Sequence, residues 1–330
     1  MKRKVCFRAD AGIEIGYGHF IRTLALADML KEVYDCTFFT QNPTEYQRQE
    51  VAKVCELVSL PVDDSKFTRF LDYLSGEEIV VLDNYFFSTD YQIAIKSKGC
   101  KLVCIDDIHD KHFVADVIIN HAPGTEPAQY SREDCTRLYL GPEYLLLRKE
   151  FRDATHSYTS FKEKKNVYVC FGGSDELNFT QKACEIILNH APRHIDVVVG
   201  GGYSYYDELK EFAKDKDITI YRNASPAQMV GLLKESCLAV VPDSMVFFEA
   251  CCLRRPIISG FDCDNQRFIS QYNQENNLSC DLGDLLDDFD NKFKTAYQQM
   301  NVTVAVDYIH NQLALINDSS EKLINIFKSL

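Results

Sequence analysis

Long apolar runs are absent from this 330-residue sequence. No stretch approaches 18 consecutive apolar residues and the N-terminus lacks the apolar core of a signal peptide, so we expect no membrane insertion and a cytoplasmic location. Internal repeats and low-complexity tracts are missing too, and the hydrophobic and charged fractions, 46% and 26%, are those of a globular protein. The length allows two ordinary domains, each with its own core.

Metal-binding and disulfide patterns are also absent. Thirteen cysteines occur without a C-x-x-C pair and without a His/Cys cluster at zinc spacing. An odd number of cysteines in a cytoplasmic chain indicates buried, reduced thiols, as in Cys251-Cys252 within an expected helix. We therefore expect no disulfide, no metal site and no cofactor.

Positive charge is scarce. Lys and Arg number 36 against 49 Asp and Glu, which gives a formal net charge of −13. This balance argues against nucleic acid or an anionic membrane surface as the main partner. It does not exclude an anionic small molecule, because a nucleotide diphosphate needs only a local nest of N–H groups and one or two cations. A monomer or a small homo-oligomer is expected.

Short apolar strands alternate with amphipathic helices over residues 1–150, which indicates a mostly parallel sheet covered on both faces. Strands are predicted at 4–7, 37–39, 79–82, 102–105 and 117–119, and helices at 20–30, 45–55 and 90–98. The charged residues 151–165 have little periodicity and are interpreted as a linker.

The pattern restarts in residues 166–315. Strands are predicted at 167–171, 195–199, 218–221, 238–241 and 256–258, and helices at 179–188, 227–234 and 246–253. The fold class is thus α/β, with two Rossmann-like domains whose parallel sheets face a cleft lined by strand C-terminal ends. A last helix is predicted near 318–330, within a C-terminal segment 316–330.

The stretch from Arg8 to Ala27 carries the strongest functional signal. Gly16 and Gly18 let the backbone between a strand and a helix approach a ligand closely. His19 falls at the helix start, where N–H groups favour an anion, and it is the group there able to move a proton near neutral pH. The dinucleotide fingerprint is incomplete, because Ile21 occupies its third glycine position.

This stretch resembles the N-terminal signature of the PseG family, roughly R-A-D, four variable positions, I-G-x-G-H-x-x-R, then L-x-L-A. It is met by Arg8-Ala-Asp10, Ile15-Gly-Tyr-Gly-His19, Arg22 and Leu24-Ala-Leu-Ala27. The family hydrolyses UDP-2,4-diacetamido-2,4,6-trideoxy-β-L-altrose in the biosynthesis of pseudaminic acid, a nonulosonic acid of bacterial surface glycans. The resemblance implies a glycosyltransferase-B-like architecture in which the last helix packs back on the first domain.

Four residues of the first domain are candidates for the chemistry. His19 is interpreted as the base that takes a proton from the attacking water, the alternative being a bond to a phosphate or a carbonyl. Tyr85 follows a strand and matches the tyrosine of a family D-x-Y, so it either holds that water or caps the sheet edge. Asp10 either orients the loop or His19, or accepts from local amides. Arg22 meets a carboxylate or phosphate, or forms a surface ion pair.

Polar residues follow two further strands. Residues 105–120 resemble the family's I-D-D…A-D-I-V-I-N, which makes Asn120 a possible sugar contact. The pair Asp106-Asp107 suggests a metal or an acid/base couple, but adjacent carboxylates rarely converge on one atom, so a loop-ordering role is favoured. Residues 144–151 echo the family's Y-x-L-L-R-x-x-F and are interpreted as structural.

In the second domain, Gly172, Gly173 and Ser174 lie in a family-like F-G-G-S-D between a strand and a helix, where bare N–H groups suit a phosphate. Ser244 matches the residue that meets the pyrophosphate in nucleotide-sugar enzymes of this architecture, and Glu249 the one that takes the ribose hydroxyls.

Two residues beside Ser244 depart from the pattern. Asp243 stands where glycine or alanine is common, and Met245 where a small or hydroxyl residue is common. A carboxylate beside a pyrophosphate weakens binding unless it points away. Asn265 and Gln266 resemble a later N-Q that reaches the sugar, with a helix N-cap as the alternative.

The sequence therefore predicts a metal-independent hydrolase that releases UDP and free sugar from a UDP-sugar substrate, with inversion at the anomeric carbon. Two rivals stay open: a glycosyltransferase of the same fold, and a non-catalytic nucleotide-sugar binding protein.

Overall fold

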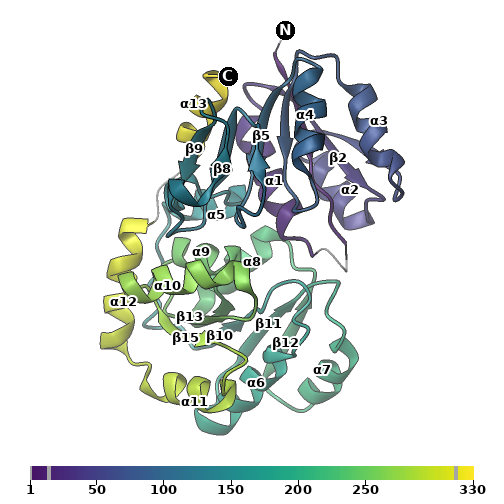
Figure 1. Ribbon diagram of the computed structural model, residues 1–330. Helices are drawn as coiled ribbons and strands as arrows, with labels where there is room; N and C mark the ends of the chain where they lie inside the picture. Colours follow the sequence, from purple (N-terminus) through teal and green to yellow (C-terminus); the bar gives the residue numbers. More distant parts are fainter. Residues whose placement is uncertain (1, 13–15, 316–318) are drawn as a thin grey trace. The chain divides into compact units, whose positions relative to one another are not determined.

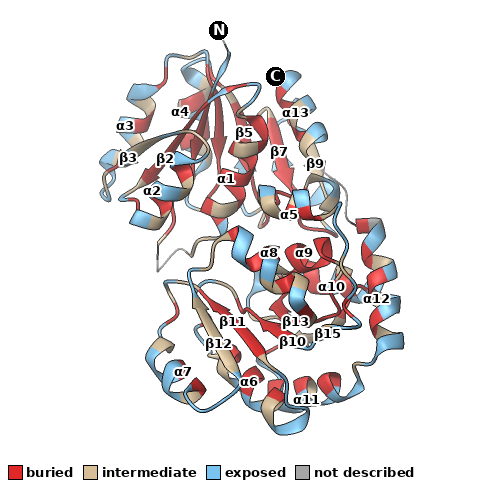
Figure 2. Cartoon of the chain, turned by 180° about the vertical axis from the view of Figure 1, so that it is seen from behind, coloured by how far each residue is buried: buried red, intermediate tan, exposed pale blue. Residues whose placement is uncertain are grey.

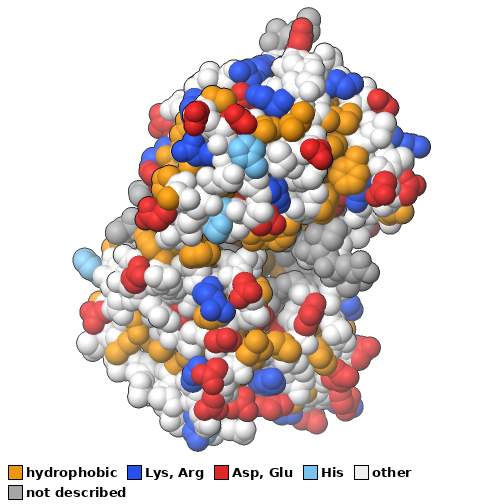
Figure 3. All heavy atoms as spheres, in the orientation of Figure 1, with side chains coloured by type: hydrophobic (Ala, Val, Ile, Leu, Met, Phe, Trp, Pro, Cys, Tyr) orange, Lys and Arg blue, Asp and Glu red, His pale blue; other side chains and the backbone are white. Residues whose placement is uncertain are grey.

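The computed structural model describes residues 2–12, 16–315 and 319–330 (Figure 1). The chain forms two compact units, Met1–Lys149 with Asp318–Leu330, and Glu150–Asn317. Among the described residues, no helix has the length and apolar character needed to cross a bilayer. Acidic side chains gather at the lower end of the second unit in Figure 3, in keeping with the net charge of −13.

The first unit is built on a seven-stranded parallel sheet in the order β3-β2-β1-β4-β5-β7-β9. Its strands are β1 (Lys4–Arg8), β2 (Asp35–Gln41), β3 (Glu56–Leu60), β4 (Ile79–Leu82), β5 (Lys101–Ile105), β7 (Val117–Asn120) and β9 (Arg137–Leu140). Its helices are α1 (Gly18–Leu30), α2 (Glu45–Ala52), α3 (Ser65–Tyr73), α4 (Thr89–Ser97) and α13 (Ser320–Lys328). A small ladder joins β6 (His112–Phe113) to β8 (Ser131–Arg132), and two 3-10 turns span Pro127–Gln129 and Pro142–Tyr144.

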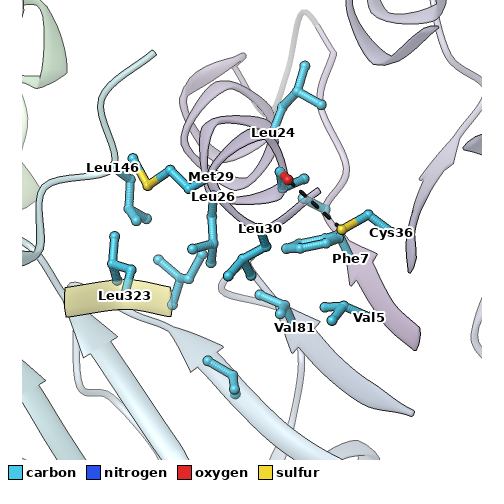
Figure 4. Packing of buried hydrophobic residues seen from close by; sticks show 14 of the residues in the cluster. Val5, Phe7, Leu24, Leu26, Met29, Leu30, Cys36, Val81, Leu146 and Leu323 are labelled. Carbon is cyan, nitrogen blue, oxygen red and sulfur yellow. Dashed lines mark hydrogen bonds between the residues drawn. The ribbon is translucent and has the colours of Figure 1, made fainter. Parts of the chain in front are cut away.

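The core of this unit explains why the C-terminal helix returns to it (Figure 4). Leu26 and Leu30 of α1 belong to the same buried cluster as Val5 of β1 and Leu323 of α13. Phe327 of α13 is 1% exposed. Full burial of one such side chain contributes about 2 kcal/mol, so α13 is an integral layer of the first unit.

The second unit has a six-stranded parallel sheet in the order β12-β11-β10-β13-β14-β15. Its strands are β10 (Asn166–Val169), β11 (Ile195–Val199), β12 (Ile218–Arg222), β13 (Ser236–Pro242), β14 (Ile257–Phe261) and β15 (Cys280–Asp284). Its helices are α5 (Lys149–Ala154), α6 (Phe179–His190), α7 (Tyr206–Ala213), α8 (Pro226–Glu235), α9 (Met245–Cys252), α10 (Arg267–Asn276), α11 (Phe289–Gln299) and α12 (Val302–Leu315), with a 3-10 turn at Asp264–Gln266.

Burial follows the layers expected of such sheets. The central strands are buried along their length, while the helices bury one side and expose the other (Figure 2). The charged segment 151–165 begins in α5 and buries Phe151 and Phe161. Two α/β units with parallel sheets thus confirm the predicted fold class.

Candidate active site

The candidate site of the first unit lies where the strand order of its sheet reverses. β1 pairs with β4 through Arg8 and Leu82, and the N–H of Asp83 donates to the Arg8 carbonyl oxygen at 3.1 Å. Helix α1 begins at Gly18, soon after β1, and carries His19 in its first turn. Ligands of such sheets bind at the carboxyl ends of the strands beside this switch point.

Asp83 orients His19. The His19 Nδ1 lies 2.7 Å from the Asp83 Oδ1, and the carboxylate is fully buried. Since an ionised carboxylate only accepts hydrogen bonds, Nδ1 carries a proton, and in the neutral ring the lone pair stands on Nε2. The Thr23 hydroxyl donates to the other Asp83 oxygen at 2.8 Å and fixes this carboxylate further. His19 is therefore held in the tautomer that a general base requires.

Arg22 joins two carboxylates beside His19. Its Nε and Nη2 donate to the two oxygens of Asp83 at 2.7 and 2.6 Å, and its Nη1 donates to the Asp107 Oδ2 at 2.6 Å. Burial raises the pKa of Asp83, but Arg22 and His19 outweigh it and hold this pKa well below its usual range. Burial also raises the pKa of Asp107, and Arg22 again turns the net shift downward. Arg22 is 5% exposed, so the ion pair is internal rather than on the surface.

Tyr85 lies against His19. The two ring centroids are 4.6 Å apart and the ring planes meet at 83°. The Lys111 Nζ donates to the Tyr85 carbonyl oxygen at 2.7 Å, which fixes the loop after β4. His19, Arg22 and Tyr85, three of the predicted residues, thus meet at one point.

Asp10 orders the loop ends instead of contacting His19. Its fully buried carboxylate is bound by the Arg8 guanidinium and accepts from the Gln41 N–H at 2.7 Å. Its own N–H donates to the Asn84 Oδ1 at 2.6 Å. These bonds tie together the ends of β1, β2 and β4, in line with the loop-ordering alternative.

The glycine loop closes on itself before α1. The Gly16 N–H donates to the Gly12 carbonyl oxygen at 2.8 Å, and Gly16 has a φ of +77°, which favours glycine. Ile15 and the two residues before it lie outside the described residues. In the described part of the chain, no side chain caps the N-terminus of α1 at Gly18, so its N–H groups are available to an anion.

The side chain of Asn120 forms its hydrogen bonds within the loop after β7. Its Nδ2 donates to the Thr125 hydroxyl at 3.1 Å and to the Tyr130 hydroxyl at 3.0 Å, and its Oδ1 accepts from the Ala122 N–H at 2.8 Å. The side chain is fully buried. Asn120 therefore shapes the loop, and both ends of its amide are engaged there.

The second unit has its own switch point between β10 and β13. The loop after β10 contains Gly172, Gly173 and Ser174, whose backbone N–H groups donate to no partner within the described ranges. A Cβ on Gly200 would stand 2.4 Å from the Gly173 carbonyl oxygen, so glycine at position 200 lets this loop lie close to β11.

The helix that follows this loop is already capped. Asp175 accepts from the N–H groups of Phe179 and Thr180 at 2.9 and 2.8 Å. Burial raises the pKa of Asp175 and these hydrogen bonds oppose the rise. An anion bound here therefore cannot use the N–H groups of Phe179 and Thr180, which Asp175 already holds.

Asp243 directly follows β13, and its side chain points into the protein. Its carboxyl is fully buried, with the Asn273 Nδ2 at 3.3 Å from its Oδ1. Burial and the neighbouring Asp281 raise the pKa of Asp243 well above its usual range. The raised pKa disfavours a charge on Asp243, and its burial keeps the carboxyl inside the protein.

Ser244 is the N-cap of α9, and its hydroxyl accepts from the Val246 N–H at 3.4 Å. Its own N–H donates to the Pro242 carbonyl oxygen at 2.8 Å and is not free for a phosphate. Met245, the first residue of α9, is half-buried, and Glu249, one turn on, is 2% exposed.

Asn265 and Gln266 lie in the 3-10 turn after β14. The Asn265 Oδ1 accepts from the Cys263 thiol at 3.0 Å, and the Gln266 Oε1 accepts from the Asp262 N–H at 3.2 Å. Both amide oxygens are therefore engaged in the turn itself.

The chain resembles several curated proteins. It is 29% identical over 278 residues to an uncharacterized protein of Methanocaldococcus jannaschii, covering 80% of this chain and 57% of that protein. It is 25% identical to the spore coat polysaccharide biosynthesis protein SpsG of Bacillus subtilis, covering 83% and 82%. It is 24% identical to the UDP-2,4-diacetamido-2,4,6-trideoxy-β-L-altropyranose hydrolase of Campylobacter jejuni, covering 76% and 89%. The chain thus spans little more than half of the archaeal relative and most of the two bacterial ones.

No protein-family model matches the chain. Solved structures match it over nearly its whole length. MurG of Acinetobacter baumannii has a TM-score of 0.65 at 11% identity, covering 99% of this chain and 100% of that one. HepE of Anabaena, solved in complex with UDP, has a TM-score of 0.60 at 11% identity, covering all of both chains. A UDP-glucosyltransferase of Polygonum tinctorium has 0.65 at 13%, covering 100% and 98%. The fold is that of the glycosyltransferase-B group, and the chain is a distant homologue of the two bacterial proteins.

Three site residues have contacts that the motifs do not predict: Thr23 lies in none of the quoted motif positions, and Asp83 and Asp107 stand in D-x-Y and I-D-D without an assigned site role. Asp83 and Thr23 hold the His19 ring, and Asp107 pairs with Arg22 rather than with its neighbour Asp106. The sequence signal for Asp83 is its place directly after the apolar strand β4, where side chains reach the ligand edge of the sheet.

Proposed function

We propose that this protein hydrolyses a nucleotide diphospho-sugar, with UDP-2,4-diacetamido-2,4,6-trideoxy-β-L-altropyranose or a similar UDP-sugar as substrate. The observation that carries the proposal is the His19–Asp83 pair at the switch point, 2.7 Å apart and next to Tyr85. The distant similarity to the Campylobacter jejuni hydrolase supports the substrate class. The products serve the synthesis of a nonulosonic acid such as pseudaminic acid.

In this reaction the His19 Nε2 takes a proton from a water molecule that Tyr85 holds in place. The water oxygen bonds to the anomeric carbon as the bond from that carbon to the diphosphate oxygen breaks. The diphosphate leaves with the electron pair, and attack opposite to it inverts the anomeric centre. Because a diphosphate leaves readily, a single base suffices without the carboxylate pair of ordinary glycosidases.

The second unit supports the proposed role of nucleotide binding. The N–H groups of Gly172, Gly173 and Ser174 are available in the loop after β10, and such groups stabilise charge developing on a leaving diphosphate. Asp243 is buried, and its raised pKa disfavours a negative charge there. The ribose contact of Glu249 belongs to the same proposal, and a sugar contact of Asn265 or Gln266 would use the amide N–H groups, since both amide oxygens are engaged in the turn.

Release of UDP from the UDP-diacetamido-trideoxyhexose, without an acceptor, tests the proposal. Wild type should release UDP, and His19→Ala should lose turnover by at least about 100-fold, the usual contribution of a general base. The matched control is His112→Ala, a half-exposed histidine bonded to Ser131 and Glu133. Equal turnover in wild type and His19→Ala would refute the role of His19.

A glycosyltransferase is the second candidate, because a UDP-glucosyltransferase is among the matching folds. Lack of UDP release without an acceptor, with turnover restored by adding a sugar or lipid acceptor, would favour it. Tight binding with the ligand unchanged after long incubation would favour a binding protein.

A further inference from the structure

A second polar group lies beside the proposed base, at the next two strand ends. β5 pairs with β7 through Ile105 and Ile119, and two positions after these paired residues stand Asp107 and His121. Since the strand order is β4-β5-β7, Asp83, Asp107 and His121 form a row along the ligand edge of the sheet. Arg22 contacts Asp83 and Asp107.

Two buried atoms of this row have no partner. The Asp107 Oδ1 and the His121 Nδ1 make no hydrogen bond within the described residues, although the side chains are buried, with 9% and 4% exposed. The other Asp107 oxygen is held by Arg22. A buried polar atom without a partner is destabilising, and such atoms in a native protein call for a ligand or water.

The chemistry of the two groups defines what they bind. Burial and the Arg22 charge lower the pKa of His121 to about 4, so its ring is neutral and offers one donor and one acceptor. Asp107 is ionised and only accepts. Together they suit a ligand group that donates to the carboxylate and exchanges a second hydrogen bond with the imidazole, which a sugar hydroxyl or an acylamino N–H does.

We propose that Asp107 and His121 form a subsite that binds a hydroxyl or acylamino group of the glycosyl part of the ligand. The subsite rests on the proposed function, because it takes the ligand to be a nucleotide sugar whose sugar lies beside His19. Neither residue belongs to the proton transfer itself. They set affinity for the sugar and leave affinity for the nucleotide unchanged.

Titration calorimetry on the full chain tests this subsite. In the His19→Ala background, which should keep the ligand intact, affinities are measured for UDP and for the UDP-diacetamido-trideoxyhexose. Asp107→Asn and His121→Gln should each weaken binding of the sugar nucleotide by at least about tenfold, the loss expected of one hydrogen bond to a charged group, and leave UDP binding within twofold. Asp110→Asn, in the same loop and half exposed, is the control.

The outcomes separate the two proposals. An unchanged ratio of sugar-nucleotide to UDP affinity in His121→Gln, a variant that loses no ion pair, would overturn the subsite and leave the hydrolase intact. If the subsite variants lower the ratio of sugar-nucleotide to UDP affinity but wild type shows no turnover, the subsite is upheld and hydrolysis is refuted. Wild type that binds the sugar nucleotide no better than UDP would overturn the subsite whatever its turnover.

Discussion

At the scale of single residues, the site depends on one carboxylate that accepts hydrogen bonds from three side chains. Asp83 accepts from His19, Arg22 and Thr23, and all of these bonds are between 2.6 and 2.8 Å. Replacing one carboxylate oxygen by an amide nitrogen would place an N–H against a donor. The His19 tautomer would then no longer be fixed.

We expect Asp83→Asn to lower kcat of UDP release by about 100-fold or more, because the ring loses both its orientation and its partner for positive charge. UDP affinity, which we assign to the second unit, should stay unchanged. Thr23→Val is the graded comparison, since it removes one hydrogen bond and leaves the charge, and should cost far less. A loss in Thr23→Val equal to that in Asp83→Asn would contradict the charge argument.

His121 makes stability depend on pH. Its pKa falls from 6.5 to about 4 on folding, so between these values the unfolded chain binds more protons and the folded state loses stability as the pH falls. The full effect is about 3 kcal/mol. In His121→Gln, urea unfolding at pH 4.5 and 6.5 should therefore differ less than in wild type.

His194 supplies the opposite sign as a comparison. Burial lowers its pKa, but Asp217 and Asp196 outweigh this and raise it above the ordinary value. Its contribution is present at low pH and is lost as the pH rises through the folded pKa. His194→Gln should thus lose stability mainly at acid pH. For each variant, the difference in free energy of unfolding from wild type is plotted against pH. Slopes of the same sign for His194→Gln and His121→Gln would contradict the two pKa assignments.

At the scale of elements, the sequence predicts buried strands well and edge strands poorly. β4 and β11 lie at the predicted residues because fully buried parallel strands are continuous apolar runs. β3, β9 and β15 were not predicted, since these edge strands are only partly buried and carry mixed side chains.

The His19–Asp83 pair could not be predicted from the sequence either. The residues are 64 positions apart, and only the pairing of β1 with β4 brings them together.

The loop after β10 offers a prediction at this scale. Gly200→Ala places a Cβ 2.4 Å from the Gly173 carbonyl oxygen and 2.7 Å from its Cα, so the loop must shift away from β11. UDP affinity should fall by at least about tenfold, as expected when a pre-organised anion site is distorted. Gly231→Ala in α8 has no atom within 4 Å of the new Cβ and should be neutral for binding and stabilising by about 0.5–1 kcal/mol. Equal UDP affinity in both variants would remove this loop from the nucleotide site.

At the scale of the whole molecule, the first unit is built from two separate segments of the chain, one at each end. Residues 150–317 form the second unit, and α13 then packs with α1 of the first. Unfolding of the first unit therefore requires the C-terminus of the chain to detach, although α13 follows the second unit in sequence. Stability of the two units can be separated by a substitution in α13.

Phe327→Ala is the decisive change, because this side chain is 1% exposed and its ring lies 6.2 Å from that of Tyr34 in the first unit. Loss of a buried phenylalanine costs about 3–5 kcal/mol. In calorimetry we expect the transition of the first unit to move to lower temperature, while the transition that UDP raises keeps its place. Leu286→Ala, 63% exposed in the second unit, should move neither. If Phe327→Ala lowered the UDP-sensitive transition instead, either α13 would stabilise the second unit or UDP would bind to the first. Phe293→Ala, a fully buried change in the second unit, decides between these two, because the transition that it lowers belongs to the second unit.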